Sequence, residues 1–400
     1  MSRVWIAVGA SIAAAVVACA TLWPERLAVN APLSGMLFGA EPPPKSELEQ
    51  RMKLPDGFSI RVFAEGIRNA RLMRFTSAGD LLVSAPRDGK VLLLERDANS
   101  DGRADGTRVL VEGLDRPHGL AFVGDWLYVA EMGAIVRVRF DAATRTVAGQ
   151  PEVVIGGLPV GGNHWSKTLG LAPDGWLYVS IGSSCNVCLE DDERRAAIAR
   201  VHTDGTGFEL YATGLRNSAG FDWRPADAAL YATDNGRDLL GDDFPPCELN
   251  RIEPGGFYGW PFLNGMGVAD PDFGGQGGAR AAAALAPAHG FAAHTAPLGM
   301  RFYRGSAFPE RYRGQAFVAL HGSWNRTAKS GYKVVLLEWP ASGGPIAESD
   351  FLTGFELDGN VIGRPVDVQD GPDGALYVSD DFAGAVYRVA YTDEVRAQPR

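Results

Sequence analysis

The chain has 400 residues, of which 46% are hydrophobic and 22% are charged, a composition typical of a globular protein with material for a large core. Its 38 basic and 48 acidic residues give a formal net charge of −10, and no run of Lys or Arg stands out, which argues against nucleic acid as a partner. Fifty glycines, 25 prolines and 10% aromatic residues, without a collagen-like period, indicate many short strands joined by tight turns.

The first residues have the pattern of an export signal, because Arg3 precedes an uncharged apolar stretch, residues 4–18. Residues 1–23 are therefore predicted to be a signal peptide or a membrane anchor, and the mature part to be periplasmic or otherwise extracytoplasmic. Three outcomes stay open. In the first, Cys19 belongs to a lipobox-like sequence and is lipidated. In the second, the signal is cleaved after Ala20. In the third, an uncleaved anchor extends to about Trp23, close to the ~20 residues that a membrane span needs. Membrane association through the N-terminus is thus one expectation.

Residues 24–53 contain three consecutive prolines and little periodicity, so they are predicted to be a flexible tether, and residues 54–395 to form one folded domain. Beyond the N-terminal region the cysteines are Cys185, Cys188 and Cys247. An oxidising compartment permits one structural disulfide among them, and the sequence leaves the pairing open. The CxxC spacing also occurs in redox and zinc sites, but no second CxxC and no haem-type CxxCH is present.

The predicted domain repeats one pattern of an apolar segment, a Pro/Asp/Gly turn and an aromatic-rich alternating strand. The copies are residues 71–94, 118–140, 169–182, 219–236, 313–339 and 366–389. Asp-Gly supplies a tight turn, and the period of two puts alternate side chains in a core. Because such sheets cannot bury both faces alone, they pack radially, which predicts an all-β, six-bladed β-propeller.

Two other segments complete the predicted ring. The early strand, residues 57–66, is expected to join the last blade, because closure removes exposed strand edges. A long insertion in blades four and five, residues 237–297, is expected on loops of one face, where functional sites form.

Two loops carry candidate polar chemistry. His164 lies in a Gly-rich loop just before a predicted strand, where its imidazole can project into the central opening and act as a base; a histidine bonded within the fold is the alternative. Arg216 and Asn217 lie at the entry to a blade, where a guanidinium can bind carboxylates; an arginine that ties two blade loops together is the alternative.

A third segment is rich in oxygen side chains among Gly and Pro residues, which suits calcium; a solvated acidic loop is the alternative. Its members are Asn235, Asp238, Asp242, Asp243 and Glu248. A separate motif resembles the start of an EF-hand loop, although Arg108 stands where that loop needs a bidentate acid. It predicts a weak structural calcium site, with a plain Asp/Gly turn as the alternative, at Asp97, Asn99, Asp101 and Asp105.

Together these motifs resemble the soluble pyrroloquinoline quinone (PQQ)-dependent sugar dehydrogenases, and within them the branch called sorbosone dehydrogenases. The likeness spans roughly residues 54–391. It rests on NHWSKTLGLAPDGWLYVSIGSSCNVC, GLRNSAGF, DNGRDLLGDDFPPCELN with GGFYGWP, HGSWNR and GRPVDVQDGPDGALYVSDD. The resemblance implies oxidation of aldose sugars or related aldehydes with PQQ and Ca²⁺, with electrons passed to an external acceptor.

The resemblance also implies site residues. His164 would take the substrate's hydroxyl proton and is counted as catalytic together with Arg216. The expected cofactor-binding residues are His164, Arg216, Asn217, Asn235, Arg364, and Arg326 or Lys333 as a further cation. The carbonyl groups of Gly236 and Arg237 would hold the cofactor's calcium, and the structural calcium ligands would be Asp242, Asp243, Glu248 and the carbonyl region of Tyr258. A flat tricarboxylate needs such cations and a metal.

The chain departs from that family at two positions. Ser183 stands where an Asp would support the catalytic His, and Val366 stands where a second Arg would follow Arg364. His294 and His321 have no assigned role, although His321 is expected to face the central opening.

Two other functions remain alternatives. A calcium-dependent lactone or ester hydrolase on the same fold would also use a central His, but it should lack the Arg-Asn pair and the other cations. A propeller that only binds a partner is the non-enzyme alternative, and it should have a flat, His-free opening.

Overall fold

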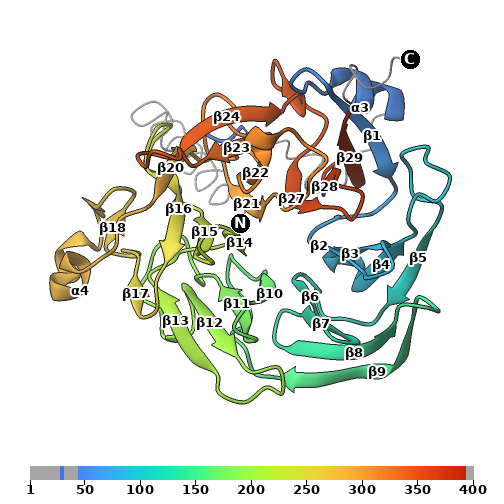
Figure 1. The fold of residues 1–400 in the computed structure, drawn as a ribbon. Helices are drawn as coiled ribbons and strands as arrows, with labels where there is room; N and C mark the ends of the chain where they lie inside the picture. Colours follow the sequence, from blue (N-terminus) through green and yellow to red (C-terminus); the bar gives the residue numbers. More distant parts are fainter. Residues whose placement is uncertain (1–27, 31–43, 393–400) are drawn as a thin grey trace, which may run out of the picture.

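The computed structural model describes residues 28–30 and 44–392. Six small antiparallel sheets form a ring around one axis (Figure 1). The predicted all-β, six-bladed propeller is confirmed, and each predicted repeat supplies two or three strands of a different blade. The predicted export segment, including Cys19, lies outside the described residues.

Each blade is numbered in chain order, and its strands are given from the axis outward. Blade 1 is β2 (Met73–Phe75), β3 (Leu81–Ala85), β4 (Lys90–Leu94) and β5 (Thr107–Val111), and blade 2 is β6 (Leu120–Val123), β7 (Trp126–Ala130), β8 (Ile135–Asp141) and β9 (Thr146–Ile155). Blade 3 is β10 (Leu169–Leu171), β11 (Leu177–Ile181), β12 (Ala197–Val201) and β13 (Glu209–Thr213), extended by β17 (Gly256–Phe257). Blade 4 is β14 (Gly220–Trp223), β15 (Leu230–Asp234), β16 (Pro246–Ile252) and β20 (His289–Ala293).

Blade 5 is β21 (Pro297–Phe302), β22 (Ala316–Leu320), β23 (Lys333–Glu338) and β24 (Ala347–Leu352), and blade 6 is β27 (Pro365–Asp370), β28 (Leu376–Asp380), β29 (Ala385–Tyr391) and β1 (Phe58–Ala64). The hairpins are β18 (Leu263–Asn264) with β19 (Val268–Ala269) and β25 (Glu356–Leu357) with β26 (Asn360–Val361). The helices and 3-10 turns are α3 (Lys45–Arg51), α4 (Gly278–Ala282), η1 (Pro86–Asp88), η2 (Gly274–Gln276) and η3 (Glu310–Tyr312).

The ring closes as predicted, because β1 pairs with β29 and becomes the outermost strand of blade 6. Phe58 anchors this closure. Its ring makes edge-on contacts, with centroid distances of 4.8 to 5.2 Å, to Phe308, Tyr312, Phe351 and Tyr391. The closing strand therefore packs against blade 5 as well as pairing within blade 6.

Residues 44–53 differ from the predicted tether. They include helix α3, whose Leu48 is buried against the cluster that also buries Phe351 and Phe355. Glu49 accepts a hydrogen bond from the backbone N–H of Val62 in β1. The folded region therefore begins before residue 54. The helix was not predicted because it directly follows three prolines, which are typical of a tether. Among the residues the structure describes, no helix is long and apolar enough to cross a membrane.

The innermost strands share one direction, because every blade repeats the same antiparallel order. Their beginnings therefore meet at one end of the axis, which we call the mouth. The loops that join the second and third strands of each blade reach the same end. Pro-Asp-Gly turns such as residues 173–175 join the first and second strands at the opposite end.

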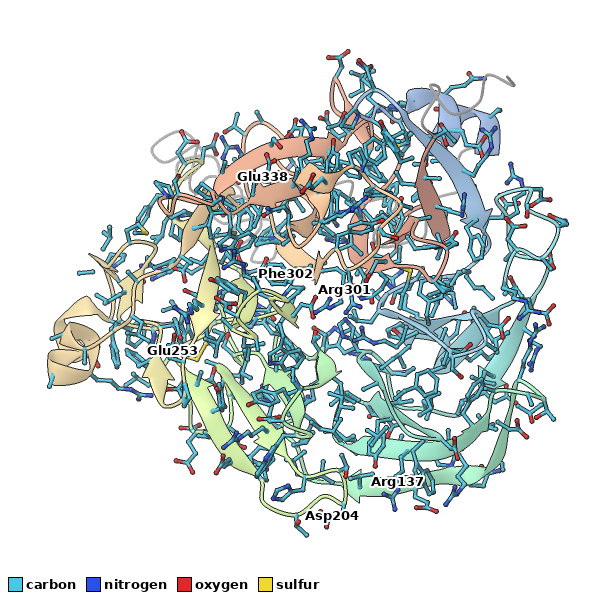
Figure 2. All side chains as sticks on the ribbon, viewed as in Figure 1. Arg137, Asp204, Glu253, Arg301, Phe302 and Glu338 are labelled. Carbon is cyan, nitrogen blue, oxygen red and sulfur yellow. A yellow bond between two sulfur atoms is a disulfide. The ribbon has the colours of Figure 1, made fainter. Side chains whose placement is uncertain are left out.

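Midway along the axis, an apolar cluster of Leu72, Ala219, Leu298 and Val366 separates the mouth from the opposite end. Beyond it lies a cavity of about 430 Å³ that Arg301 lines. Arg301 is near the axis in Figure 2, whereas Arg137 is at the outer rim.

Residues 237–297, predicted to be insertions on loops of one face, follow that prediction only in part, because they include the blade strands β16 and β20 and the β16–β20 connection starts at the end opposite the mouth. The β15–β16 loop lies at the mouth, and residues 253–288 pack outside the ring, where β17 pairs with β13 and α4 projects outward (Figure 1).

Replacing Phe58 with alanine should lower the free energy of unfolding by about 3 kcal/mol, because the closing strand loses its aromatic contacts. Phe58→Leu should lose less. Urea unfolding monitored by circular dichroism measures the change. Val109→Ala, on the exposed edge strand β5, is the control and should stay within about 0.5 kcal/mol of the parent protein. A loss at Phe58 no larger than the control's would show that this closure does not limit stability.

Candidate active site

The mouth collects the polar residues that the sequence singled out. His164 and Arg216 lie in the loops that enter β10 and β14, and Arg364 directly precedes β27. They lie far apart in the chain and come together only because these innermost strands begin at the same end of the ring.

His164 is held by Ser183. Its Nδ1 lies 2.8 Å from Ser183 Oγ and 3.0 Å from Ser183 O. Because Ser183 Oγ donates its proton to the carbonyl oxygen of Cys185 at 2.8 Å, both groups facing Nδ1 are acceptors. The proton of the neutral imidazole therefore sits on Nδ1, and Nε2 carries a lone pair. The missing Asp is thus replaced by a serine that orients the ring without adding charge.

The surroundings of His164 disfavour a positive charge. Burial, with a smaller contribution from the Arg216 guanidinium, lowers the pKa of His164 to about 3. The imidazole is therefore neutral near pH 7. Gly182 lets the ring approach, because a Cβ there would lie 2.5 Å from His164 Cβ and 3.0 Å from Asn217 Oδ1.

Arg216 is buried and fixed by four hydrogen bonds. Nε donates to Asn186 O at 2.8 Å, Nη2 donates to Asn186 Oδ1 at 2.9 Å and to Asp238 Oδ2 at 3.2 Å, and Nη1 donates to Asn235 O at 3.1 Å. A guanidinium has five N–H donors, so within the described part of the chain one remains for a ligand. Arg216 therefore ties loops together, as the alternative interpretation held, and still offers a donor.

The carboxylate of Asp234 fixes the backbone of the loop that carries Arg216 and Asn217. It accepts hydrogen bonds from the backbone N–H groups of Arg216 at 2.9 Å and of Asn217 at 2.6 Å, and from Ser218 Oγ at 3.3 Å. Burial raises the pKa of Asp234 to about 7. The Arg216–Asn217 pair thus has a fixed backbone.

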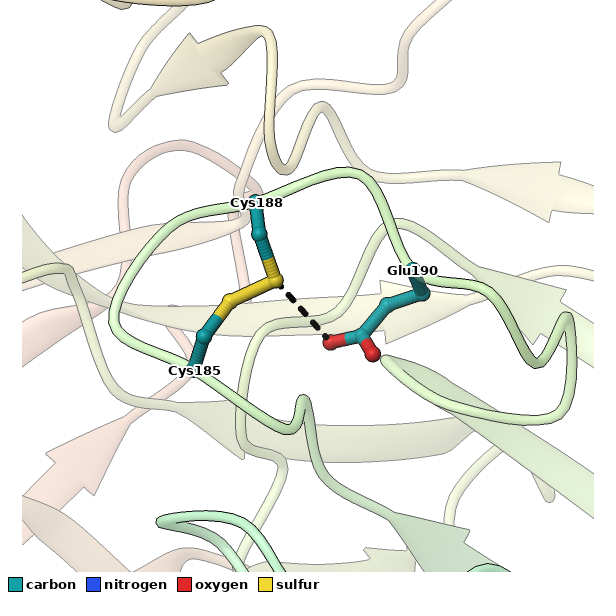
Figure 3. Close-up of side chains that lie close together, drawn as sticks. All are labelled: Cys185, Cys188 and Glu190. Atoms are coloured by element: carbon teal, nitrogen blue, oxygen red, sulfur yellow. Dashed lines mark hydrogen bonds between the residues drawn. A yellow bond between two sulfur atoms is a disulfide. The ribbon is translucent and has the colours of Figure 1, made fainter.

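The disulfide joins Cys185 to Cys188, and Cys247 is free and buried. This settles the pairing that the sequence left open. Glu190 lies 3.8 Å from Cys188 Sγ (Figure 3), but the two sulfur atoms bond each other, so this group is not a zinc site. The disulfide closes a short loop around Asn186, the residue that fixes Arg216.

A second cluster at the mouth joins His321 to Asp381, Arg71 and His118, three residues that the sequence pattern did not indicate. Asp381 Oδ1 accepts from His321 Nε2 at 2.9 Å, and its Oδ2 accepts from Arg71 Nη1 at 2.9 Å. Arg71 Nη2 lies 3.4 Å from His118 Nε2. The charges of His321 and Arg71 hold the pKa of Asp381 below its usual range against the effect of burial. Burial and Arg364 lower the pKa of His321 to about 4.

Arg364 belongs to this second cluster. Its Nε donates to His321 O at 3.1 Å and its Nη2 donates to Gly322 O at 2.8 Å. The expectation that His321 lies toward the opening fits this position. Val366, in contrast, is fully buried in the apolar cluster beneath the mouth, so the second arginine of the family pattern has no counterpart there.

The two alternative cations do not join either cluster. Lys333 binds Asp350 of the outermost strand β24, so its ammonium is directed away from the axis. Arg326 donates from Nη1 to Asp242 O and from Nη2 to Asp243 Oδ1 at 2.8 Å. The contacts of Arg326 fix the β15–β16 loop, and Lys333 is not placed for the role that the sequence gave it.

The predicted calcium ligands between Asn235 and Glu248 do not form one cluster. Asp243 is largely exposed and pairs with Arg326, whereas Glu248 is buried in β16. Glu248 and Tyr258 line one cavity of about 20 Å³ together with Trp260, whose indole N–H has no hydrogen-bond partner in the described part of the chain. Burial, and then Asp234, raises the pKa of Glu248 to about 8. The calcium role of Glu248 and Tyr258 stays a prediction.

The remaining predicted ligands have varied surroundings. Asn235 Nδ2 donates to Asn217 O and to Pro297 O, each at 3.1 Å, and Gly236 follows it in the loop. The side chain of Arg237 turns outward and binds Asp270, at 2.7 and 2.9 Å. At these two positions the candidate ligands for the cofactor's calcium are therefore the backbone carbonyl groups of Gly236 and Arg237, and this role stays a prediction.

The EF-hand-like loop lies between β4 and β5, at the end opposite the mouth. Its side chains bind its own backbone: Asp97 accepts from the N–H groups of Asp101 and Gly102, and Asn99 accepts from that of Asp101. Asp105 accepts from Ala98 N. These are the bonds of a compact Asp/Gly turn, and the calcium site stays a prediction.

A family model described as TrAA12-like matches residues 52–255 and 278–392. The chain belongs to this family. The TrAA12-like chain is 26% identical to a pyrroloquinoline quinone-dependent pyranose dehydrogenase of Coprinopsis cinerea, over 87% of this chain and 56% of that protein. It therefore spans about half the length of that relative.

Two solved structures share the fold of the TrAA12-like chain. One is the holo form of the pyranose dehydrogenase PQQ domain from Coprinopsis cinerea, with a TM-score of 0.72 and 24% identity over 85% of this chain and 97% of that chain. The other is the calcium structure of the Trichoderma reesei enzyme of Carbohydrate-Active Enzymes family AA12, with a TM-score of 0.73 and 22% identity over 85% and 97%. The resemblance to PQQ-dependent sugar dehydrogenases is confirmed at the level of the family.

The mouth of this TrAA12-like chain fits a flat polycarboxylate. Within the residues that the structure describes, Arg216 has one unused donor and Arg71 Nε is buried without a hydrogen-bond partner. A buried donor without a partner costs free energy, so a carboxylate that accepts from it would be favoured. Trp165 adds a planar surface beside His118, with 5.8 Å between ring centroids.

Placing a carboxylate at Ser183 should raise the pKa of His164, because a negative charge at Nδ1 stabilises the imidazolium. In the parent protein His164 should stay neutral from pH 7 to pH 5, because burial lowers its pKa from 6.5 to about 3. Protons then favour the unfolded chain, so His164 removes stability as pH falls through this window.

Histidine-selective NMR titration of the six histidines measures both effects. Ser183→Asp should raise the pKa of His164 by about 1 unit or more, and Ser183→Ala is the uncharged control. A parent His164 that titrates near its ordinary value would contradict the buried site described here.

Proposed function

We propose that this protein is a PQQ- and calcium-dependent oxidoreductase that oxidises aldose sugars or related, sorbosone-like aldehydes and passes the electrons to an external acceptor. The observation that carries the proposal is one opening where guanidinium donors lie beside the neutral imidazole of His164, whose Nε2 accepts no hydrogen bond from the described residues. Membership of the TrAA12-like family and the named activity of the Coprinopsis relative support it. Because the chain covers only 56% of that relative, the substrate and the acceptor belong to the proposal.

The cations at the mouth would hold the cofactor's carboxylates. Arg216 offers its fifth N–H, Arg71 offers Nε, and Arg364 lies across the opening. Asn217, whose Oδ1 is near Gly182, would add an amide between Arg216 and His164. Carbonyl oxygens of Gly236 and Arg237 would complete the calcium site, since oxygen ligands suit calcium.

The chain's own residues would manage the proton. Hydride leaves a carbinol carbon readily when the hydroxyl proton leaves with it, so a base within hydrogen-bond reach is required. His164 Nε2 is that base in our proposal, because the Ser183 contact keeps the other nitrogen protonated. When bound, PQQ with its calcium supplies the two-electron acceptor for the hydride.

Export is part of the proposal. The apolar stretch after Arg3 supports it, and so does the Cys185–Cys188 disulfide, because disulfides persist in oxidising compartments. We propose a periplasmic or otherwise extracytoplasmic location, with membrane attachment through the N-terminus.

Reconstitution tests the function directly. The purified apo-protein with PQQ and Ca²⁺ should reduce a redox dye in the presence of aldoses, and chelation of Ca²⁺ should abolish this. Arg216→Lys should weaken PQQ binding by about tenfold or more, because one ammonium cannot reproduce the guanidinium's bonds. Arg137→Lys, at the outer rim, is the control. Absence of both PQQ binding and dye reduction would refute the proposal; hydrolysis of lactones or esters would favour the alternative enzyme.

Three histidine variants identify the base. His164→Asn should keep PQQ binding and lose about 10²- to 10⁴-fold in turnover, the usual contribution of general base catalysis. His321→Asn should mainly weaken binding. His289→Asn is the control, because His289 pairs with Glu348 on the outer part of the ring. Full turnover in His164→Asn together with its loss in His321→Asn would move the base to the His321–Asp381 pair.

A further inference from the structure

Exposed apolar side chains gather around one part of the mouth. Val160 is 56% exposed, Leu189 54%, Leu239 39% and Trp324 40%, and Val29 of the N-terminal segment is 52% exposed. We call these five residues the apolar rim. Single exposed apolar residues are ordinary, but a group on one face marks an interaction surface.

Hydrogen bonds connect the loops of the apolar rim. Arg195 Nη2 donates to Val160 O at 2.6 Å, and Arg195 Nε also lies 4.0 Å from Glu190, next to Leu189. Asn186 Nδ2 donates to Asp238 O at 3.1 Å, which brings the disulfide loop against the loop of Leu239.

Leu239 N in turn donates to Asn325 Oδ1 at 2.7 Å, next to Trp324. Leu357, in the hairpin before blade 6, is also exposed and continues the series.

The other side of the mouth is charged. Among the described residues, the mouth loops of blades 1 and 2 carry no exposed large apolar side chain. They carry pairs such as Arg68 with Asp88 at 3.3 Å and Lys90 with Glu112 at 3.9 Å. A flat surface that covers the apolar rim would therefore leave this charged side open to a polar substrate.

The N-terminal segment is bound to the apolar rim itself. Asn30 N donates to Trp324 O at 3.0 Å, and Asn30 Nδ2 donates to Thr327 O at 2.8 Å. Asn325 Nδ2 donates to Ala28 O at 2.7 Å. Residues 28–30 thus form a strap across the loop between β22 and β23.

The short length of chain between this strap and the apolar N-terminal stretch limits how far the apolar rim can lie from that stretch. Residues 19–27 separate Ala28 from the uncharged apolar stretch, residues 4–18. Fully extended, they reach at most about 35 Å. A segment that is lipidated at Cys19, or that stays in a membrane, therefore keeps this face next to the bilayer. Tryptophan and aliphatic side chains are favoured at that boundary.

We propose that the apolar rim rests on the lipid bilayer into which the N-terminal segment is anchored, so that the mouth faces the membrane surface at a tilt. The contact is apolar rather than electrostatic, because the chain is acidic overall and Asp243 in the same loops is already paired with Arg326. It therefore suits zwitterionic headgroups and persists in high salt. The proposal rests on the anchor and not on the oxidation chemistry.

The test uses the full chain reconstituted into vesicles of zwitterionic phosphatidylcholine that contain a nitroxide lipid. A bimane label is attached at Val160→Cys or Leu189→Cys. Matched controls are Val109→Cys and Val153→Cys, which are 43% and 68% exposed on the outer edge strands β5 and β9, and Leu171→Cys at the opposite end. The parent chain, labelled in the same way, corrects for Cys19; Cys247 is buried.

The rim labels should lose most of their emission and keep that loss in high salt, whereas the control labels should stay bright. Equal quenching at all positions, stronger quenching at residue 171, or recovery of the full chain in the soluble fraction would overturn the proposal. Quenching that appears only with anionic vesicles at low salt would also overturn it, because it would indicate an electrostatic contact. Dye reduction in the same vesicles reports on the proposed oxidoreductase separately.

Discussion

The shared direction of the innermost strands is the constraint on which the site depends. Each blade begins at the axis and runs the same way, so residues just before β2, β6, β10, β14 and β27 meet at one end although the chain separates them widely. Closure by β1 completes the last blade, so that every blade of the ring lies between two neighbours. The apolar cluster around Val366 then lies between the mouth and the cavity at the opposite end, which Arg301 and Asp222 line.

Burial of charge at the mouth is tolerated because each group has partners. Arg216 is neutralised by Asp238 and by carbonyl dipoles, and Arg71 by Asp381. A buried ion that loses one partner is expensive, so these groups hold their loops in one geometry. Among the described residues, Arg71 Nε is a buried donor at the mouth that has no hydrogen-bond partner. The same network thus stabilises the loops and prepares the mouth for an anionic group.

The fold could be predicted closely because its signals are local and repeated. Alternating strands recur in each blade, and Asp-Gly turns join the first two strands of blades 3 and 6. The one remaining strand, β1, closes the ring. Helix α3 was not predicted because it follows a Pro-rich segment and, among its described side chains, only Leu48 is buried.

The site was less predictable, since its members pair across blades. Asp381 follows directly after β28, and Arg71 comes shortly before β2, yet nothing in either local sequence indicates that they meet. Lys333 was named with Arg326 from the family resemblance, and only the structure shows that its ammonium pairs with Asp350.

The two imidazoles at the mouth show why a serine can replace an acid without removing a base. A carboxylate at Nδ1 would do two things: fix the tautomer and stabilise the protonated ring. Ser183 does only the first, because its hydroxyl proton is committed to Cys185 O and its oxygen must accept.

His164 therefore remains a neutral acceptor whose proton, once taken, is held weakly and can leave quickly. His321 differs because the carboxylate of Asp381 lies against one nitrogen, although burial and Arg364 still lower its pKa to about 4. Ionic strength, pH and a bound polycarboxylate should affect the two rings differently, since only His321 has a carboxylate bonded to its ring.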